Sequence, residues 1–160
     1  MGDRLTNEEV VRRYAAASMA ADVDAMGALR HPEWSVTWPQ SGERVVDQAA
    51  YRQILRHYPG GSPRTVTTRI VGSEDQWVLT PGNTVIRVVG SGDTWWCQWR
   101  VTYPDAIEYL CIDLIELRDD LIHRESVYWA PVFEPPTWRS AWVERADRRA
   151  SSGGPEDAAG

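Results

Sequence analysis

The chain is 160 residues long, with a formal net charge of −6 and a mean hydropathy of −0.45. That length predicts one domain with a hydrophobic core, and the acidic balance excludes the basic surface that a nucleic-acid-binding protein needs. Because the first nine residues are polar and no apolar run is long enough to span a bilayer, we expect a soluble protein without a signal peptide or a membrane partner.

The cysteine and lysine content of the chain indicates its redox compartment and excludes one class of covalent catalysis. Cys97 and Cys111 both lie in predicted strands, where buried free thiols are the usual case, so we expect a reducing, cytoplasmic compartment. All 17 basic residues are arginines, which excludes a Schiff-base lysine within the chain. Most aromatic residues are Trp or Tyr, whose polar groups suit pockets and interfaces as well as cores.

The first 58 residues predict three helices, with one short strand between the second and the third. Thr6 and Glu9 form a capping-box pattern that starts the first helix. Asp22 is placed to cap the second helix, which the His31–Pro32 pair ends. In order, the predicted elements are a helix over 7–21, a short helix after Asp22, a strand over 34–38, a loop over 40–46 and a helix over 47–58.

After residue 63 the apolar pattern changes to period two, which is typical of antiparallel strands. Helices followed by hairpin-connected strands predict an α+β architecture, and residues 137–145 predict a short terminal helix. We expect one domain over 1–145 and a disordered tail over 146–160, because that tail is small and polar. The predicted strands cover 65–72, 76–80, 84–89, 94–103, 107–117 and 121–129.

One carboxylate interrupts the apolar residues of the last hairpin. Two β-rich runs flank Asp119–Asp120, which predicts a two-residue turn, and Asp113 lies within the first run. Ionised carboxylates avoid apolar surroundings unless they are paired or hydrogen-bonded. A three-residue turn would place Glu125 opposite Asp113. The two-residue turn instead places these residues opposite or diagonal to it: Ser126, Arg124 and Tyr128.

The preceding turn, over 104–106, places Asp113 opposite Cys97 and one pair from Trp99. Aromatic surroundings would raise the pKa of the Asp113 carboxyl, as a general acid or base requires. The alternative is a buried structural aspartate that Arg124 neutralises or that Ser126 or Tyr128 holds by a hydrogen bond.

The segment over 112–122 resembles the terminal hairpin of the SnoaL-like branch of the nuclear transport factor 2-like superfamily. That hairpin has an apolar strand, an Arg-Asp-Gly-Lys-Ile type of turn and a second strand that ends in aromatic residues. Asp113 falls where the polyketide cyclases of this branch carry their catalytic aspartate. Asp120 departs from the family's glycine, and Trp99 stands where a cyclase would be expected to place a second polar group.

The resemblance covers about residues 5–129 and implies a cone-shaped barrel, in which a curved antiparallel sheet wraps around three N-terminal helices. It further implies a cofactor-free pocket for a small hydrophobic or aromatic molecule. The leading function is an acid/base enzyme of the cyclase, isomerase or hydrolase kind, in which Asp113 moves a proton. The alternative is a non-catalytic module of the same fold that binds a ligand or a protein partner.

Aromatic residues are expected to form the pocket wall. Helices close the cone, so their tyrosines and the first strand's Trp are candidates for its mouth, where a hydroxyl could polarise a substrate carbonyl. Core packing accounts equally well for many of these rings. The predicted ligand-binding residues are Tyr14, Trp38, Tyr51, Trp99, Arg124, Ser126 and Tyr128.

We expect no metal site, because His31, His57 and His123 lie on different elements without ligand spacing.

The face of strand 107–117 opposite Asp113 carries Leu110, Ile112 and Leu114. A sheet covered by helices on one side should be polar on the other, and exposed aliphatic residues on this scale normally mark an interface. We therefore expect a homodimer formed through this outer face.

Overall fold

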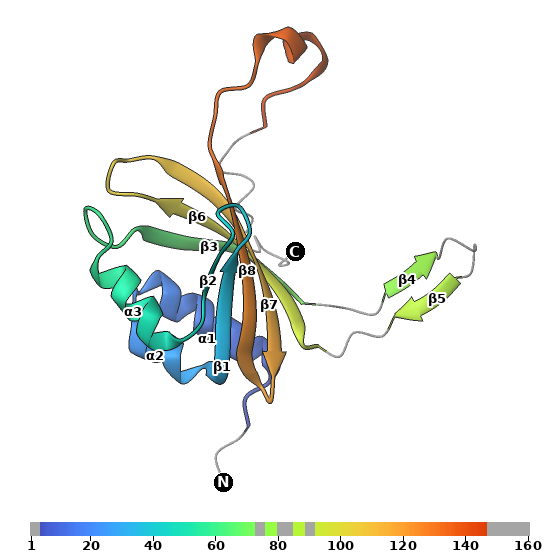
Figure 1. The fold of residues 1–160 in the computed structure, drawn as a ribbon. Helices are drawn as coiled ribbons and strands as arrows, with labels where there is room; N and C mark the ends of the chain where they lie inside the picture. The colour runs from blue at the N-terminus through green and yellow to red at the C-terminus, as the bar shows by residue number, and fades with distance from the viewer. Residues whose placement is uncertain (1–3, 73–75, 80–84, 89–91, 147–160) are drawn as a thin grey trace, which may run out of the picture.

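The computed structural model describes residues 4–72, 76–79, 85–88 and 92–146 (Figure 1). Three helices lie on one side of a curved sheet, and they are α1 (Asn7–Met19), α2 (Val23–Ala28) and α3 (Gln48–Arg56). The predicted α+β class and the packing of the sheet around N-terminal helices are confirmed. Among the described residues, no helix has the length and apolar character needed to cross a membrane.

The sheet has six strands in the order β2-β1-β8-β7-β6-β3 and does not close on itself. Its neighbouring strands are antiparallel except β1 and β8, which run parallel and so depart from the predicted all-antiparallel sheet. The strands are β1 (Arg30–Trp38), β2 (Glu43–Val45), β3 (Arg64–Gly72), β6 (Thr94–Thr102), β7 (Glu108–Arg118) and β8 (Leu121–Pro131).

Several predicted boundaries are wrong. His31–Pro32 lies inside β1 and does not end α2, because β1 loses its pairing with β8 just there and can accept a proline. The predicted loop over 40–46 contains β2. A 3-10 helix, Thr137–Trp142, replaces the predicted terminal helix. The expected disordered tail lies outside the described residues from position 147 onward.

Two predicted strands do not join the main sheet. The strands β4 (Gln76–Leu79) and β5 (Val85–Val88) pair with each other in a separate antiparallel sheet, which Figure 1 shows apart from the six-stranded one.

Alternation along β7 is as predicted. Cys111, Asp113 and Ile115 are buried, whereas the residues between them, Ile112 and Leu114, are exposed on the other face. The buried face meets α1, which contributes its own apolar residues to one core. Asp113 therefore points toward the helices, on the concave side of the sheet.

The hairpin between β7 and β8 contains one extra residue. The turn at Asp119–Asp120 is left-handed at both positions, with φ of 53° and 58°, and it pairs Leu117 with Ile122 as a two-residue turn should. Glu116 then pairs with Arg124, so His123 has no partner across the strand pair. Because side chains alternate with period two, this bulge moves every later residue of β8 to the opposite face.

The capping box at the start of α1 is confirmed. The Thr6 hydroxyl accepts a hydrogen bond from the Glu9 backbone N–H at 3.3 Å, and the Glu9 carboxylate accepts one from the Thr6 backbone N–H at 2.8 Å. These bonds satisfy two of the amides that a helix start leaves unpaired.

Replacing the cap should weaken the fold measurably. We expect Thr6→Ala to lower the free energy of unfolding by about 1 kcal/mol, because an N-cap hydroxyl contributes about that much. Urea denaturation followed by circular dichroism measures this change. Arg13→Ala, at an exposed position of the same helix, is the control and should change stability by less than about 0.5 kcal/mol.

Candidate functional site

A cavity of about 380 Å³ lies between the helices and the concave face of the sheet. Its polar residues are few and include Arg30 and Glu125. Pockets of this kind bury small organic molecules, and the polar groups orient them. The aromatic residues that line the cavity are Tyr14, Trp34, Trp38, Tyr51, Tyr58, Trp99, Tyr103 and Trp129.

Four of the seven predicted ligand-binding residues are in this cavity wall. They are Tyr14 on α1, Trp38 on β1, Tyr51 on α3 and Trp99 on β6. The rings pack against one another in edge-to-face pairs, including Trp34 with Tyr51 at 5.6 Å between ring centroids. The helices and the sheet therefore build a continuous aromatic surface.

The other three predicted residues, Arg124, Ser126 and Tyr128, do not line the cavity, and their predicted placement is wrong. They lie beyond the bulge at His123, which turns them to the outer face of β8, where Tyr128 is 43% exposed. Three residues of β8 face the cavity in their place: Glu125, Val127 and Trp129.

Asp113 is completely buried and does not itself line the cavity, so the expectation that it would border the open space is wrong. It pairs with Cys97 on β6, as predicted, but with Val127 instead of Ser126 on β8. No N–H or hydroxyl group among the described residues donates to either carboxyl oxygen of Asp113, and a hydrogen bond between Asp113 and the Glu125 carboxyl requires a proton on one of the two. Burial of an unpaired carboxylate is costly, so this group favours its protonated form.

Glu125 is the carboxylate that reaches the cavity. Its Oε2 accepts hydrogen bonds from the Tyr14 hydroxyl at 2.9 Å and from the Trp34 indole N–H at 2.5 Å. Tyr14 in turn accepts a hydrogen bond from Arg30 Nε at 2.8 Å. These three residues come from α1 and β1, so the network joins both to β8.

Arg30 is a buried cation held by aromatic rings. Its guanidinium carbon lies 3.6 Å from the ring centroid of Trp34 and 4.3 Å from that of Tyr51. It also donates a hydrogen bond to the Gln48 side chain. Only 7% of the residue is exposed, so its charge acts on the neighbouring carboxyls with little screening by water.

Burial raises the pKa of Asp113 well above its usual range, and the negative charge of Glu125 raises it further, while Arg30 opposes both effects. One buried cation thus faces two carboxyl groups. The arrangement is balanced when one of the two is ionised and the other keeps its proton. Burial also raises the pKa of the Tyr14 hydroxyl, which stays a neutral hydrogen-bond donor.

Sequence reasoning missed Arg30 and the position of Glu125 in the cavity wall. Arg30 lies at the start of a strand that was predicted to begin four residues later. Glu125 was considered only as the partner of Asp113 under a three-residue turn, because a bulge within β8 leaves no clear mark in the sequence. An acidic residue among the apolar positions of a predicted strand was the one available signal.

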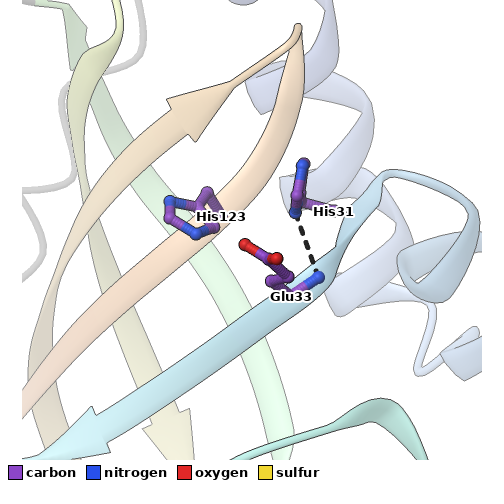
Figure 2. A group of neighbouring side chains, drawn as sticks. All are labelled: His31, Glu33 and His123. Atoms are coloured by element: carbon purple, nitrogen blue, oxygen red, sulfur yellow. Dashed lines mark hydrogen bonds between the residues drawn. The ribbon is translucent and has the colours of Figure 1, made fainter.

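The structure also brings together two histidines that sequence spacing does not relate. The rings of His31 and His123 lie 5.1 Å apart between centroids, in an edge-to-face arrangement, with Glu33 beside them (Figure 2). The parallel pairing of β1 with β8 places them side by side.

Comparisons with known proteins agree with this fold. Residues 11–125 match the model of the SnoaL-like domain. Among curated proteins, none matches this sequence. Similar solved structures include a candidate ketosteroid isomerase from Kribbella flavida, at 21% identity and a TM-score of 0.66, over 88% of this chain and 90% of that one. The identities are low, so this likeness concerns the fold alone.

Two further structures show the same fold. An NTF-2-like protein of unknown function from Burkholderia xenovorans is 24% identical, with a TM-score of 0.63, over 88% of this chain and 95% of that one. A candidate polyketide cyclase from Pseudomonas putida is 17% identical, with a TM-score of 0.57, over 79% of this chain and 93% of that one.

Replacing Asp113 should change how stability depends on pH. Above the usual aspartate pKa of about 3.9, the folded protein keeps a proton that the unfolded chain has lost, so the free energy of unfolding falls as pH rises. The slope is about 1.4 kcal/mol per pH unit until the raised pKa is reached. We expect Asp113→Asn to remove this slope and to stabilise the protein at neutral pH, as measured by urea denaturation across the pH range.

The control is Glu116→Gln, on the same strand but exposed on its outer face. It should leave the pH dependence unchanged. If Asp113→Asn loses stability with rising pH as the wild type does, Asp113 is not protonated in the folded protein.

Proposed function

Because the chain belongs to the SnoaL-like family, we propose that its cavity binds a small, planar hydrophobic molecule and that the Asp113–Glu125 pair moves a proton on it. The reaction class is cofactor-free acid/base chemistry on an enolisable substrate, as in a cyclisation or an isomerisation. A hydrolase reaction on an epoxide would use the same pair.

The observation that carries this proposal is the pair of buried carboxyl groups, of which Glu125 lines the cavity and Asp113 lies behind it. Both hydrogen bonds to Glu125 end on Oε2, which leaves Oε1 for a substrate proton or for a proton shared with Asp113. Glu125 borders the cavity and Asp113 does not, so we assign proton transfer with the substrate to Glu125. Asp113 then serves as a positioning residue that holds the second proton of the pair.

Charge and hydrogen bonding around the pair support the same assignment. Removing a proton next to a carbonyl group creates negative charge on the substrate, and a buried cation lowers the cost of that charge. Arg30 supplies this cation, fixed between Trp34 and Tyr51. Among the described residues the buried Trp99 indole N–H has the weakly accepting Cys97 thiol beside it and makes no hydrogen bond to an oxygen or nitrogen, so a ligand oxygen would be a stronger partner.

A second candidate function is ligand binding without chemistry. Arg30 already donates to Tyr14 and Gln48, and Tyr14 already donates to Glu125. A network that satisfies itself in this way also suits a purely structural cavity floor. Binding and turnover must therefore be measured separately.

Exchange of substrate protons for deuterium tests the proposal without knowledge of the natural substrate. We expect the protein to catalyse exchange of the protons next to the carbonyl in a panel of planar cyclic ketones in D2O, followed by NMR. Glu125→Gln keeps the hydrogen bonds from Tyr14 and Trp34 but removes the base, so exchange should fall at least about 100-fold. Quenching of tryptophan fluorescence by the ketone should be nearly unchanged, because the aromatic wall is intact.

Glu43→Gln is the matched control, since Glu43 also lines the cavity but lies outside the network. It should leave exchange unchanged. Fluorescence quenching without any exchange by the wild type would favour the binding module, and exchange that survives Glu125→Gln would contradict the assignment of the base.

We further propose that the chain forms a homodimer through the outer face of its sheet and works in a reducing compartment such as the cytoplasm. The face opposite the helices exposes several apolar residues, and burying them would remove that surface from water. Cys97 and Cys111 are both buried as free thiols, which supports the compartment. The exposed apolar residues of this face are Val66, Leu110, Ile112, Leu114 and Tyr128.

Light scattering tests the dimer. We expect a mass of twice the 18.1 kDa of one chain, and we expect Ile112→Glu to yield monomers because it places charge at the centre of the interface. Arg56→Glu, at an exposed position on α3, is the control and should stay dimeric. A wild-type monomer at micromolar concentration would contradict the proposal.

A further inference from the structure

We propose that His31, Glu33 and His123 bind a divalent transition-metal ion, at a site separate from the cavity. Their potential ligand atoms all lie within 4.8 Å of one another, and the three side chains converge from β1 and β8 (Figure 2). None of them lines the cavity. The inference is therefore independent of the function proposed above.

The strands are irregular at this cluster. Arg30 pairs with Ile122, and the next pair along is Ser35 with Arg124. Residues 31–34 of β1 thus lie opposite a single residue of β8, His123, in the strand register. Bulges of this kind re-aim side chains and are common beside functional sites. Both strands leave their regular pairing where the three candidate ligands meet.

The chemistry of the three side chains selects the class of metal. Two imidazoles and one carboxylate suit Zn²⁺, Co²⁺ or Ni²⁺, whereas Ca²⁺ and Mg²⁺ prefer sites made of oxygen ligands. His31 and Glu33 are two residues apart on one strand, which is the spacing that places side chains on one face. His123 reaches them from the neighbouring strand.

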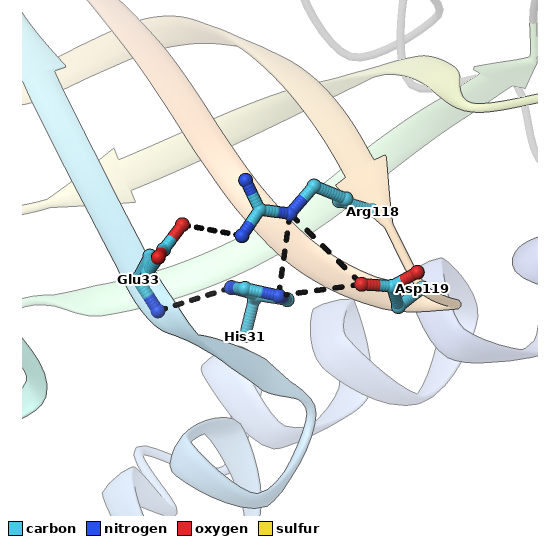
Figure 3. A network of polar contacts seen from close by, with 4 residues as sticks. All are labelled: His31, Glu33, Arg118 and Asp119. Carbon is cyan, nitrogen blue, oxygen red and sulfur yellow. Dashed lines mark hydrogen bonds and ion pairs between the residues drawn. The ribbon is translucent and has the colours of Figure 1, made fainter.

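The Arg118 guanidinium is the positive group at this cluster, and it contacts Glu33, His31 and Asp119 (Figure 3). Arg118 forms an ion pair with Glu33, and its Nε lies 3.3 Å from Nε2 of His31. The Asp119 carboxylate lies 3.6 Å from the same Nε2. Asp119 is largely exposed and lies outside the group of three candidate ligands, so it is a neighbour of His31 and not a member of the proposed site.

Arg118 competes with a metal ion for this position. Its guanidinium supplies positive charge to Glu33, and like charges repel, so it must move when the metal binds. The side chain is 44% exposed and has room to swing into solvent. Removing its charge should therefore tighten metal binding.

Metal binding must also change a backbone hydrogen bond. The Glu33 N–H lies 3.0 Å from Nδ1 of His31, and the Arg118 Nε–H lies 3.3 Å from Nε2. A neutral ring accepts at only one nitrogen, and we assign the acceptor to Nδ1 because its contact is shorter. A neutral imidazole has only one lone pair, so coordination through either nitrogen must break this bond. The Glu33 amide is a direct reporter of the metal.

Isothermal titration calorimetry with Zn²⁺ and visible absorption with Co²⁺ test the site on the full chain. We expect one metal per chain, and we expect Glu33→Gln and His123→Asn each to weaken binding by more than about tenfold, because even supporting residues of metal sites contribute that much. Arg118→Gln should bind more tightly than the wild type. The Glu33 amide should shift in ¹H–¹⁵N spectra when Zn²⁺ is added.

His57→Asn is the matched control, because His57 is the remaining histidine and lies on the C-cap of α3. It should bind metal as the wild type does. Circular dichroism of each variant without metal checks its fold, and the exposed Glu33 gives a test even if the more buried His123 cannot be replaced. Absence of binding by the wild type, or binding that Glu33→Gln and His123→Asn leave unchanged, would overturn the proposal.

Discussion

The buried guanidinium of Arg30 is the group on which the polar interior of this protein depends. It lies between the rings of Trp34 and Tyr51 and donates to the Tyr14 hydroxyl, which donates to Glu125. Breaking a buried charge pair by removing one partner typically costs about 3–5 kcal/mol, because the other charge is left uncompensated. Through Tyr14, the Arg30 guanidinium thus connects α1, β1 and β8 around the cavity, and its positive charge stabilises a buried carboxylate there.

The same cation explains why two acidic residues can share one apolar interior. A single positive charge balances one carboxylate, so the second carboxyl is stable only when it keeps its proton. Asp113, which is deeper and receives no hydrogen bond from an N–H or hydroxyl group among the described residues, is the group that keeps it. Glu125 lines the cavity wall, so it is the carboxyl group that a ligand would contact. Environment, not residue type, separates the two roles.

The irregular pairing around His123 has two separate consequences. Along β8 it reverses which residues face inward, and so it places Glu125 in the cavity and Ser126 outside it. Between β8 and β1 it leaves residues 31–34 without regular strand pairing, and there His31 and Glu33 lie beside His123. The place of Glu125 in the cavity wall and the gathering of the histidine cluster thus both depend on the irregular pairing around His123.

The sequence by itself determined the elements that rest on local physics. Four features follow from neighbours along the chain or from a short turn. They are the capping box of α1, the period-two alternation that sets Asp113 opposite the aliphatic face, the left-handed Asp119–Asp120 turn and the pairing of Asp113 with Cys97. The family resemblance added the helices that cover the sheet, and with them the aromatic cavity wall.

Only the tertiary structure decided which residues meet at the site. The parallel pairing of β1 with β8 joins segments about 90 residues apart, and no local pattern specifies it. Because side chains along a strand alternate with a period of two, a single bulge reverses both faces of the strand beyond it. The inserted residue at His123 therefore makes Glu125 and Val127, and not Ser126 and Tyr128, face the cavity. Arg30 acquired its role only when α1, α3 and β8 closed around it, because a buried cation is stable only where several distant elements supply its partners.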